Sequence, residues 1–251
     1  MPINYPIDKE IKFDKNFYSM IVDNLNDVIS NIEFKDEYIN SLLQTLEMNL
    51  TFIPSSTQRK ELVDISLYDH LKLTAGFALC IKQYLDELDV DDYKTMLYKD
   101  SKKFYDCKAF RIYSLDLSGI QDFIYNIDSK SALKGLRARS FYLEILVENA
   151  VDELLNRLEL CRTNVLYVGG GNMYLLLPAT KKSFEVIQNF EAELNTWFLN
   201  NFGIALYAAG GYSDCSSNHL QNIPSGSYAE TFESIIKSIT EKKFHRYNAE
   251  D

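Results

Sequence analysis

The sequence predicts an α+β protein in which a helical N-terminal segment precedes a domain built from an antiparallel sheet and helices. Over the second half of the chain, short runs of aromatic and branched residues alternate with amphipathic helical patterns. The first hundred residues carry helical patterns. With 251 residues, 46% apolar and 25% charged, the chain is long enough to bury a core of ordinary composition.

The predicted elements of the second half follow the order strand, short helix, long helix, strand, strand, helix, strand, helix. Their ranges are 110–117, 120–125, 131–160, 164–168, 173–177, 181–200, 204–212 and 228–243. Glycines between the second and third strands indicate a hairpin turn, because glycine adopts positive φ at little cost. The order resembles the ferredoxin-like arrangement of polymerase palms and nucleotidyl cyclases, in which helices cover one face of the sheet.

The N-terminal part is predicted to be a helical domain of residues 1–100, followed by the sheet domain of residues 101–251. After an extended lead-in, helices are expected at 17–31, 37–48 and 67–88, with Ser66 as the N-cap of the third. A dense acidic run at 86–100 indicates a solvated linker, although an acidic metal site is an alternative. Asp69 and His70 are interpreted as a polar pair at a helix start, with a metal site as the other reading.

Composition argues against several classes of protein. A net charge of −10 makes the chain a poor nucleic-acid binder on its own. The sequence shows no apolar run of about 20 residues and no signal peptide, so we expect a cytoplasmic protein without membrane contact. The cysteines are far apart, which favours reduced thiols over a zinc site or disulfides. They are Cys80, Cys107, Cys161 and Cys215.

The strongest candidate for chemistry is the end of the first predicted strand. Asp116 stands there, directly before the tight loop at Ser118 and Gly119. In palms, this strand end lies beside the turn of the following hairpin, and each offers a carboxylate to two Mg²⁺ ions. The turn at 169–172 is Gly-Gly-Gly-Asn and has no acid. We therefore assign no catalytic and no metal-binding residue.

Phosphate binding is a second hypothesis for the same region. The glycine turn exposes backbone N–H groups, and Lys134, Arg137 and Arg139 cluster near the start of the long helix, where the helix dipole favours anions. The alternative is structural. Asp116 would then cap the loop, and the basic residues would form a solvated helix face.

Three stretches, 115–125, 132–144 and 164–177, together resemble the first palm domain of the large subunit of type III-A (Csm-type) CRISPR effector complexes. Upstream, 52–57 and 64–72 resemble the end of that subunit's HD-type nuclease domain. The family's hairpin turn usually ends in Gly-Gly-Gly-His, where this chain has Asn172. The match covers most of the chain in the same order.

The resemblance implies a role within a larger protein. The family's subunit degrades single-stranded DNA and joins ATP into cyclic oligoadenylates, and it carries an HD motif, a zinc-binding insert and a second palm with Gly-Gly-Asp-Asp. None of these motifs occurs here, so we expect an internal piece of the subunit or the product of a split gene. The implied partners are the remainder of the subunit and other Csm subunits, with guide and target RNA contacted indirectly.

By the same resemblance, this piece supplies one wall of a composite ATP pocket, with Mg²⁺ held mainly by the second palm. The residues expected to bind nucleotide are Asp116, Ser118, Gly119, Lys134, Arg137, Gly170, Gly171 and Asn172. Two alternatives stay open. The first alternative is a stand-alone nucleotidyl cyclase-like enzyme, and the second is a non-catalytic interaction module.

Overall fold

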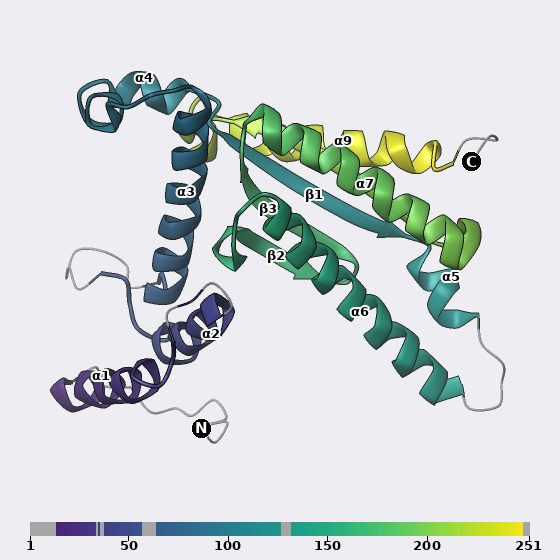
Figure 1. The fold of residues 1–251 in the computed structure, drawn as a ribbon, viewed down its shortest axis with the longest axis horizontal. Coiled ribbons are helices and arrows are strands. Elements are labelled where there is room, and N and C mark those ends of the chain that lie inside the picture. Colours follow the sequence, from purple (N-terminus) through teal and green to yellow (C-terminus); the bar gives the residue numbers. More distant parts are fainter. Residues whose placement is uncertain (1–13, 34, 36–37, 57–63, 127–131, 248–251) are drawn as a thin grey trace. The chain divides into compact units, whose positions relative to one another are not determined.

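The computed structural model describes residues 14–33, 35, 38–56, 64–126 and 132–247 (Figure 1). By their internal contacts, the residues divide into two compact units, 1–71 and 72–251. This division lies within the third helix, upstream of the acidic run in which the sequence predicts the domain boundary. The boundary at residue 100 stays a prediction.

The first unit contains α1 (Lys15–Ile29), α2 (Ile39–Leu50) and the beginning of α3 (Leu67–Glu87). Helix α1 begins earlier than predicted because the Asp14 side chain accepts a hydrogen bond from the Phe17 N–H, at 2.9 Å. A small apolar core joins the elements of this unit. Its buried members are Ile21, Leu50, Ile53 and Tyr68.

Helix α3 begins where the sequence predicts, and Ser66 caps it. The Ser66 hydroxyl accepts a hydrogen bond from the Asp69 N–H, at 3.3 Å. Most of the predicted extended lead-in lies outside the described residues. Glu37 and Ser131, the expected first residues of two helices, also lie outside them.

The second unit is built on a four-stranded antiparallel sheet. Its strands are β1 (Phe110–Ser118), β2 (Val165–Gly169), β3 (Asn172–Pro178) and β4 (Tyr207–Cys215), in the order β2-β3-β1-β4. This order confirms the predicted ferredoxin-like arrangement. Strand β4 begins later than the predicted residue 204, because Gly203–Ala205 forms a turn of 3-10 helix.

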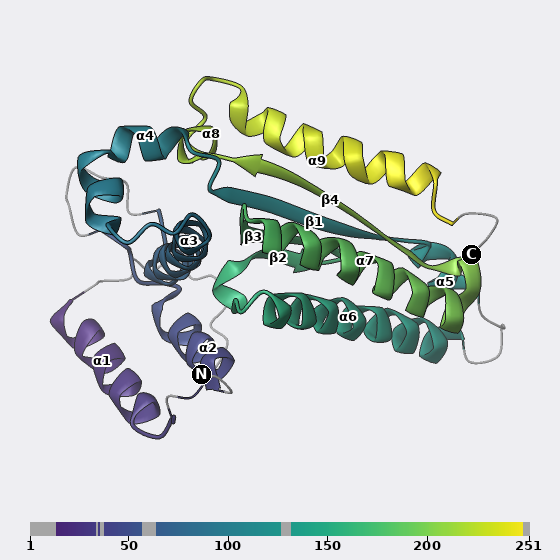
Figure 2. The same ribbon diagram turned by 45° about the horizontal axis from the view of Figure 1, so that its top comes forward.

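Helices cover both faces of this sheet. Helices α6 (Ala132–Arg157) and α7 (Lys181–Phe202) pack against one face, and α9 (Ser227–Phe244) packs against the other (Figure 2). The short helix α5 (Ile120–Tyr125) follows β1. The expectation that helices cover a single face is therefore wrong, because α9 returns over β4 and β1 on the opposite side.

Alternation along β1 separates two cores. Tyr113, Leu115 and Leu117 point toward α6 and α7, whereas Phe110 and Ile112 point toward α9. The same alternation places Asp116 on the α9 face.

The long predicted helix is confirmed as α6, but its apolar face is only partly buried. Leu133 and Phe141 belong to the apolar periodicity from which this helix is predicted, yet they are 61% and 66% exposed. Buried positions begin at Leu143. The first turns of α6 extend beyond the strands, so the sheet does not cover them (Figure 1).

Two segments predicted as irregular contain short helices. The acidic run ends in a π-helical turn, Thr95–Lys99, which leads into α4 (Ser101–Asp106). The predicted loop 213–226 contains α8 (Ser217–Leu220), whose first N–H groups are satisfied by a capping box of Ser216 and His219.

The four cysteines are free thiols, as their spacing predicts. Cys80 and Cys215 are buried in the core beneath α9. Burial raises the pKa of the Cys215 thiol to about 12 and also raises the pKa of Cys80. Both side chains therefore act as small apolar groups in this core.

Candidate functional site

The end of β1 lies beside the turn of the β2–β3 hairpin, as the palm arrangement predicts. Asp116 is directly opposite Asn172 in the pairing of β1 with β3. The Leu117 N–H donates a hydrogen bond to the Gly171 carbonyl, at 2.9 Å. The two segments that carry most of the predicted site residues are thus held together by backbone hydrogen bonds.

The hairpin turn consists of Gly170 and Gly171, which have φ angles of +61° and +83°. Positive φ at both central residues is typical of the tight turn that fits the twist of a hairpin. A Cβ on Gly171 would lie 2.0 Å from Cδ1 of Ile120, whereas a Cβ on Gly170 would have no heavy atom within 4 Å. The Ile120 methyl group can rotate away, so the positive φ, and not the packing, requires glycine at 171, whereas Gly170 lies on open surface.

The loop after β1 is determined by its own packing. Gly119 has φ of +89°, and a Cβ there would lie 1.8 Å from the Ala205 carbonyl oxygen. Ser118 is buried and pairs with Tyr207 of β4. The fold itself accounts for the small residues at both positions, whatever binds nearby.

Asp116 has an ion-pair partner that the sequence analysis did not identify. Its Oδ2 lies 2.7 Å from Nζ of Lys243, in the last turn of α9. The Asp116 side chain is 27% exposed, and that of Lys243 is 32% exposed. The carboxylate is thus both paired and reachable from solvent.

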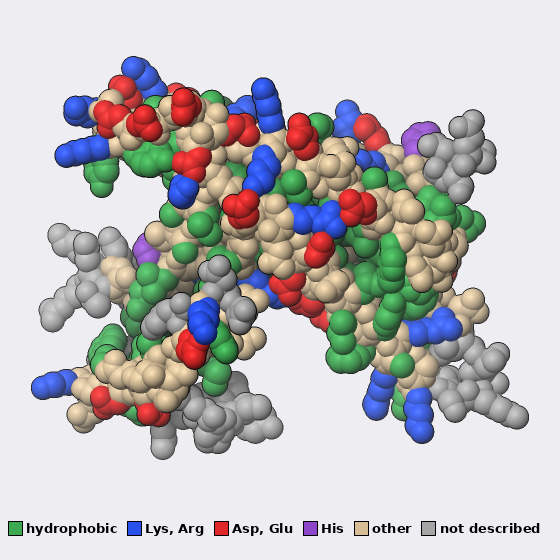
Figure 3. Space-filling model, viewed as in Figure 1, with side chains coloured by type: hydrophobic (Ala, Val, Ile, Leu, Met, Phe, Trp, Pro, Cys, Tyr) green, Lys and Arg blue, Asp and Glu red, His purple; other side chains and the backbone are tan. Residues whose placement is uncertain are grey.

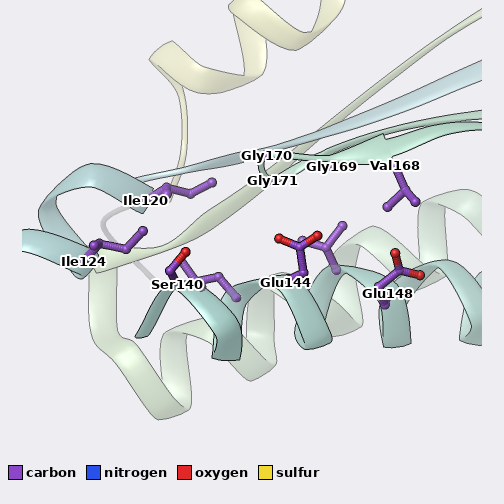
Figure 4. Close-up of a pocket in the computed structure, with 11 residues that line it drawn as sticks. Ile120, Ile124, Ser140, Glu144, Glu148, Val168, Gly169, Gly170 and Gly171 are labelled. Carbon is purple, nitrogen blue, oxygen red and sulfur yellow. The ribbon is translucent and has the colours of Figure 1, made fainter. Parts of the chain in front are cut away.

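A small cavity of about 120 Å³ lies on the other face of the sheet, between the glycine turn, α5 and α6 (Figure 4). Glu144 and Glu148 point from α6 toward the hairpin, and Ile120 and Ile124 form an apolar side. Its lining consists of Ile120, Ile124, Ser140, Leu143, Glu144, Val147, Glu148, Val168, Gly169, Gly170 and Gly171. Carboxylates and isoleucines do not favour a phosphate group.

Lys134 and Arg137 lie in the first turns of α6, exposed, and outside the lining of that cavity. Lys and Arg side chains project from this end of α6 (Figure 3). Arg139 has a structural contact instead, because its guanidinium donates to the Phe123 carbonyl at 2.5 Å and stacks on the Phe123 ring. This contact joins α6 to α5.

The predicted residues therefore fall into three groups. Asp116 and Asn172 lie on the face of the sheet that α9 covers, and Gly170 and Gly171 form the hairpin turn. Lys134 and Arg137 lie in the first turns of α6, outside the cavity lining. Ser118 and Gly119 support the loop between strand and helix. A role in nucleotide binding stays a prediction for all of these residues.

Sequence reasoning missed Lys243, Glu144 and Glu148. The two glutamates lie four residues apart on α6, a spacing that places them on one helix face and was visible in the sequence. Lys243 gave no such signal, because its contact with Asp116 depends on how α9 packs against the sheet.

No three His, Cys, Asp or Glu side chains of the described residues are grouped closely enough to hold a metal ion. None of the helices in that part of the chain combines the length and apolar character needed to cross a membrane.

Comparison with known proteins identifies the family. Residues 109–251 match the family described as Csm1 subunit domain B. The chain belongs to the Csm1 family. The resemblance predicted from the three sequence stretches is confirmed, and the matched residues span all four strands of the Csm1 domain described above.

Curated Csm1 relatives are described as CRISPR system single-strand-specific deoxyribonucleases Cas10/Csm1 of subtype III-A. The protein from Mycobacterium tuberculosis is 43% identical over 99% of this chain and 32% of its own length. The protein from Enterococcus italicus is 42% identical over 97% of this chain and 33% of its own length. The chain thus spans about a third of the length of these relatives.

Solved Csm1 structures share the fold. A Csm1–Csm4 cassette in complex with pppApA has a TM-score of 0.79 and 29% identity, covering 94% of this chain and 31% of that one. A cassette in complex with one ATP has a TM-score of 0.74 and 30% identity, covering 92% and 30%.

Proposed function

We propose that this chain is the part of a type III-A CRISPR large subunit that supplies one wall of a composite ATP pocket. The observation that carries the proposal is the pairing of the β1 end with the glycine turn, which puts Asp116, Asn172 and Gly170 at one end of the strands. Solved relatives of the same fold bind ATP, AMPPNP and pppApA, which supports a nucleotide as the ligand.

The whole subunit would degrade single-stranded DNA and join ATP into cyclic oligoadenylates. The names of the curated relatives support the first activity, and solved cassettes in complex with cA3 and cA4 support the second. The partners would be the rest of the large subunit and a Csm4 subunit, with guide and target RNA contacted through other subunits.

The size of the cavity beside the turn supports a composite pocket, because the described residues at this place do not enclose a nucleotide. Ligand pockets usually measure about 300–1,000 Å³, whereas the cavity beside the turn measures about 120 Å³. The residues present also do not fit a pair of Mg²⁺ ions. Asp116 is the one acid at the strand end, its carboxylate is paired with Lys243, and the turn offers an amide at Asn172. The metal-binding carboxylates would therefore belong to the second palm.

The test is a substitution that keeps the turn and fills the space in front of it. Asn tolerates the left-handed conformation of Gly170, so Gly170→Asn should fold while placing a side chain on the open face. In the full-length subunit assembled with Csm4, we expect KM for ATP to rise at least several-fold, measured as cyclic oligoadenylate formed at limiting ATP.

Gly226→Asn is the matched control. Gly226 is also left-handed, with φ of +98°, and the nearest heavy atom to a Cβ there would be Oε1 of Glu230, at 3.9 Å, but it lies before the first turn of α9, away from the hairpin turn. This control should leave KM for ATP at the parental value. A Gly170→Asn complex with the parental KM would contradict the proposal.

A further inference from the structure

The last turn of α9 carries two adjacent lysines with different partners. Nζ of Lys242 lies 2.5 Å from Glu191 of α7, whose side chain is 10% exposed. Lys243 instead pairs with Asp116, directly opposite Asn172 of the glycine turn. We infer that Lys243 is the cation by which this wall contacts the phosphate groups of ATP, and that Asp116 is the positioning residue that orients it. The inference rests on the proposed function.

The location of Lys243 is set by close packing of α9 on the sheet. A Cβ on Gly211 of β4 would lie 2.7 Å from the Ile235 carbonyl oxygen, so the helix backbone approaches the strand where that strand has no side chain. Ile235 and Ile239 are buried against the sheet. The helix is thereby fixed, and Lys243 reaches the end of β1 from one turn further on.

Electrostatics favours Lys243 over Asp116 as the group that meets the ligand. A triphosphate is strongly anionic, and an unpaired Asp116 would repel it. Pairing with Lys243 neutralises the carboxylate, and an ammonium group has three donors, of which Asp116 needs one. With its side chain 32% exposed, Lys243 can direct the others toward solvent, where the second wall would hold the nucleotide.

The neighbouring cations of this helix end have other partners. Lys242 is directed to Glu191, and Arg246 donates from Nε to the Lys243 carbonyl oxygen at 3.3 Å. If Lys243 had only a structural role, its loss would change the stability of the fold little, because partly exposed ion pairs contribute about 0–1 kcal/mol. Loss of Lys243 should therefore affect ATP and leave the fold unchanged.

The experiment uses the full-length subunit assembled with Csm4. Lys243→Met should raise KM for ATP about tenfold, the size expected for one charge-assisted hydrogen bond, with a smaller change in kcat and an unchanged melting temperature. Lys237→Met removes the same charge from an exposed position of the same helix and should leave KM unchanged. Equal effects of the two substitutions would overturn the inference, because only net charge would then matter.

A charge swap separates positioning from simple pairing. Asp116→Lys combined with Lys243→Asp restores an ion pair but moves the cation onto the strand. We expect the swapped complex to keep a raised KM. Recovery of the parental KM would show that the ion pair matters but the position of its cation does not, and it would overturn the inference.

Failure of the inference is distinguishable from failure of the proposed function. If Gly170→Asn raises KM for ATP and Lys243→Met does not, the proposed function is supported and the role of Lys243 is rejected. If neither substitution changes KM, both are rejected.

Discussion

Asn164 is the most deeply buried polar residue that joins α3 to the sheet. Its side chain is fully buried, and Nδ2 lies 2.8 Å from the Leu176 carbonyl oxygen and 3.3 Å from that of Gly76. A Cβ on Gly76 would lie 2.8 Å from the Thr163 carbonyl oxygen, so α3 approaches this loop closely. One amide thus serves two carbonyl groups that water does not reach.

We predict that Asn164→Ala destabilises the chain by about 1–3 kcal/mol, because two buried hydrogen bonds are lost and a typical one contributes about 0.5–1.5 kcal/mol. Denaturant unfolding followed by circular dichroism measures the change. Asn149→Ala, at an exposed position of α6, is the control and should be close to neutral. A loss below about 1 kcal/mol at Asn164 would contradict this account.

Individual residues were predictable from sequence where local geometry required them. Gly119 and Gly171 were identified because tight turns need positive φ, and both have it. Asp116 was identified by its place at a strand end. Lys243 was not, because it meets Asp116 only after α9 packs on the sheet, and neither periodicity nor composition encodes that contact.

At the scale of elements, α9 packs closely against β4. Gly211 faces the helix backbone, and its missing side chain leaves the space that the Ile235 carbonyl occupies. The sequence predicted both elements from their periodicity. It did not predict their contact, because the amphipathic pattern of α9 shows that one face is buried without showing against which side of the sheet.

Gly211→Ala should therefore destabilise the second unit by about 1–3 kcal/mol, the usual cost of adding a methyl group to a well-packed core. The atom in the way belongs to the backbone, so no rotamer change relieves the clash. Thermal unfolding checks this. A melting temperature equal to the parental value would mean that α9 lies further from β4 than described.

The same reasoning explains the error on α6. Its periodic apolar face runs from Leu133 onward, yet burial begins at Leu143, because the strands end before the helix does. Periodicity predicts which side of a helix is apolar. It does not reveal how far the partner surface extends.

At the scale of the whole molecule, the chain presents one paired carboxylate and a neutral turn where a palm needs several anionic oxygens. We predict that the chain by itself makes no cyclic oligoadenylate from ATP and cleaves no single-stranded DNA, in Mg²⁺ or Mn²⁺. Product analysis by chromatography and a nuclease assay measure both activities. Turnover that Asp116→Ala abolishes would favour the stand-alone cyclase alternative.

The two lysine contacts of α9 also restrict how that helix can move. Successive residues of an α-helix project about 100° apart around its axis, and Lys242 and Lys243 reach α7 and β1 from the same turn. Rotation of α9 about its own axis in either direction lengthens at least one of the two ion pairs. Both pairs therefore favour the one rotational setting that the packing of Ile235 and Ile239 already defines, and a ligand that draws the Lys243 ammonium away from Asp116 removes one of these two weak constraints.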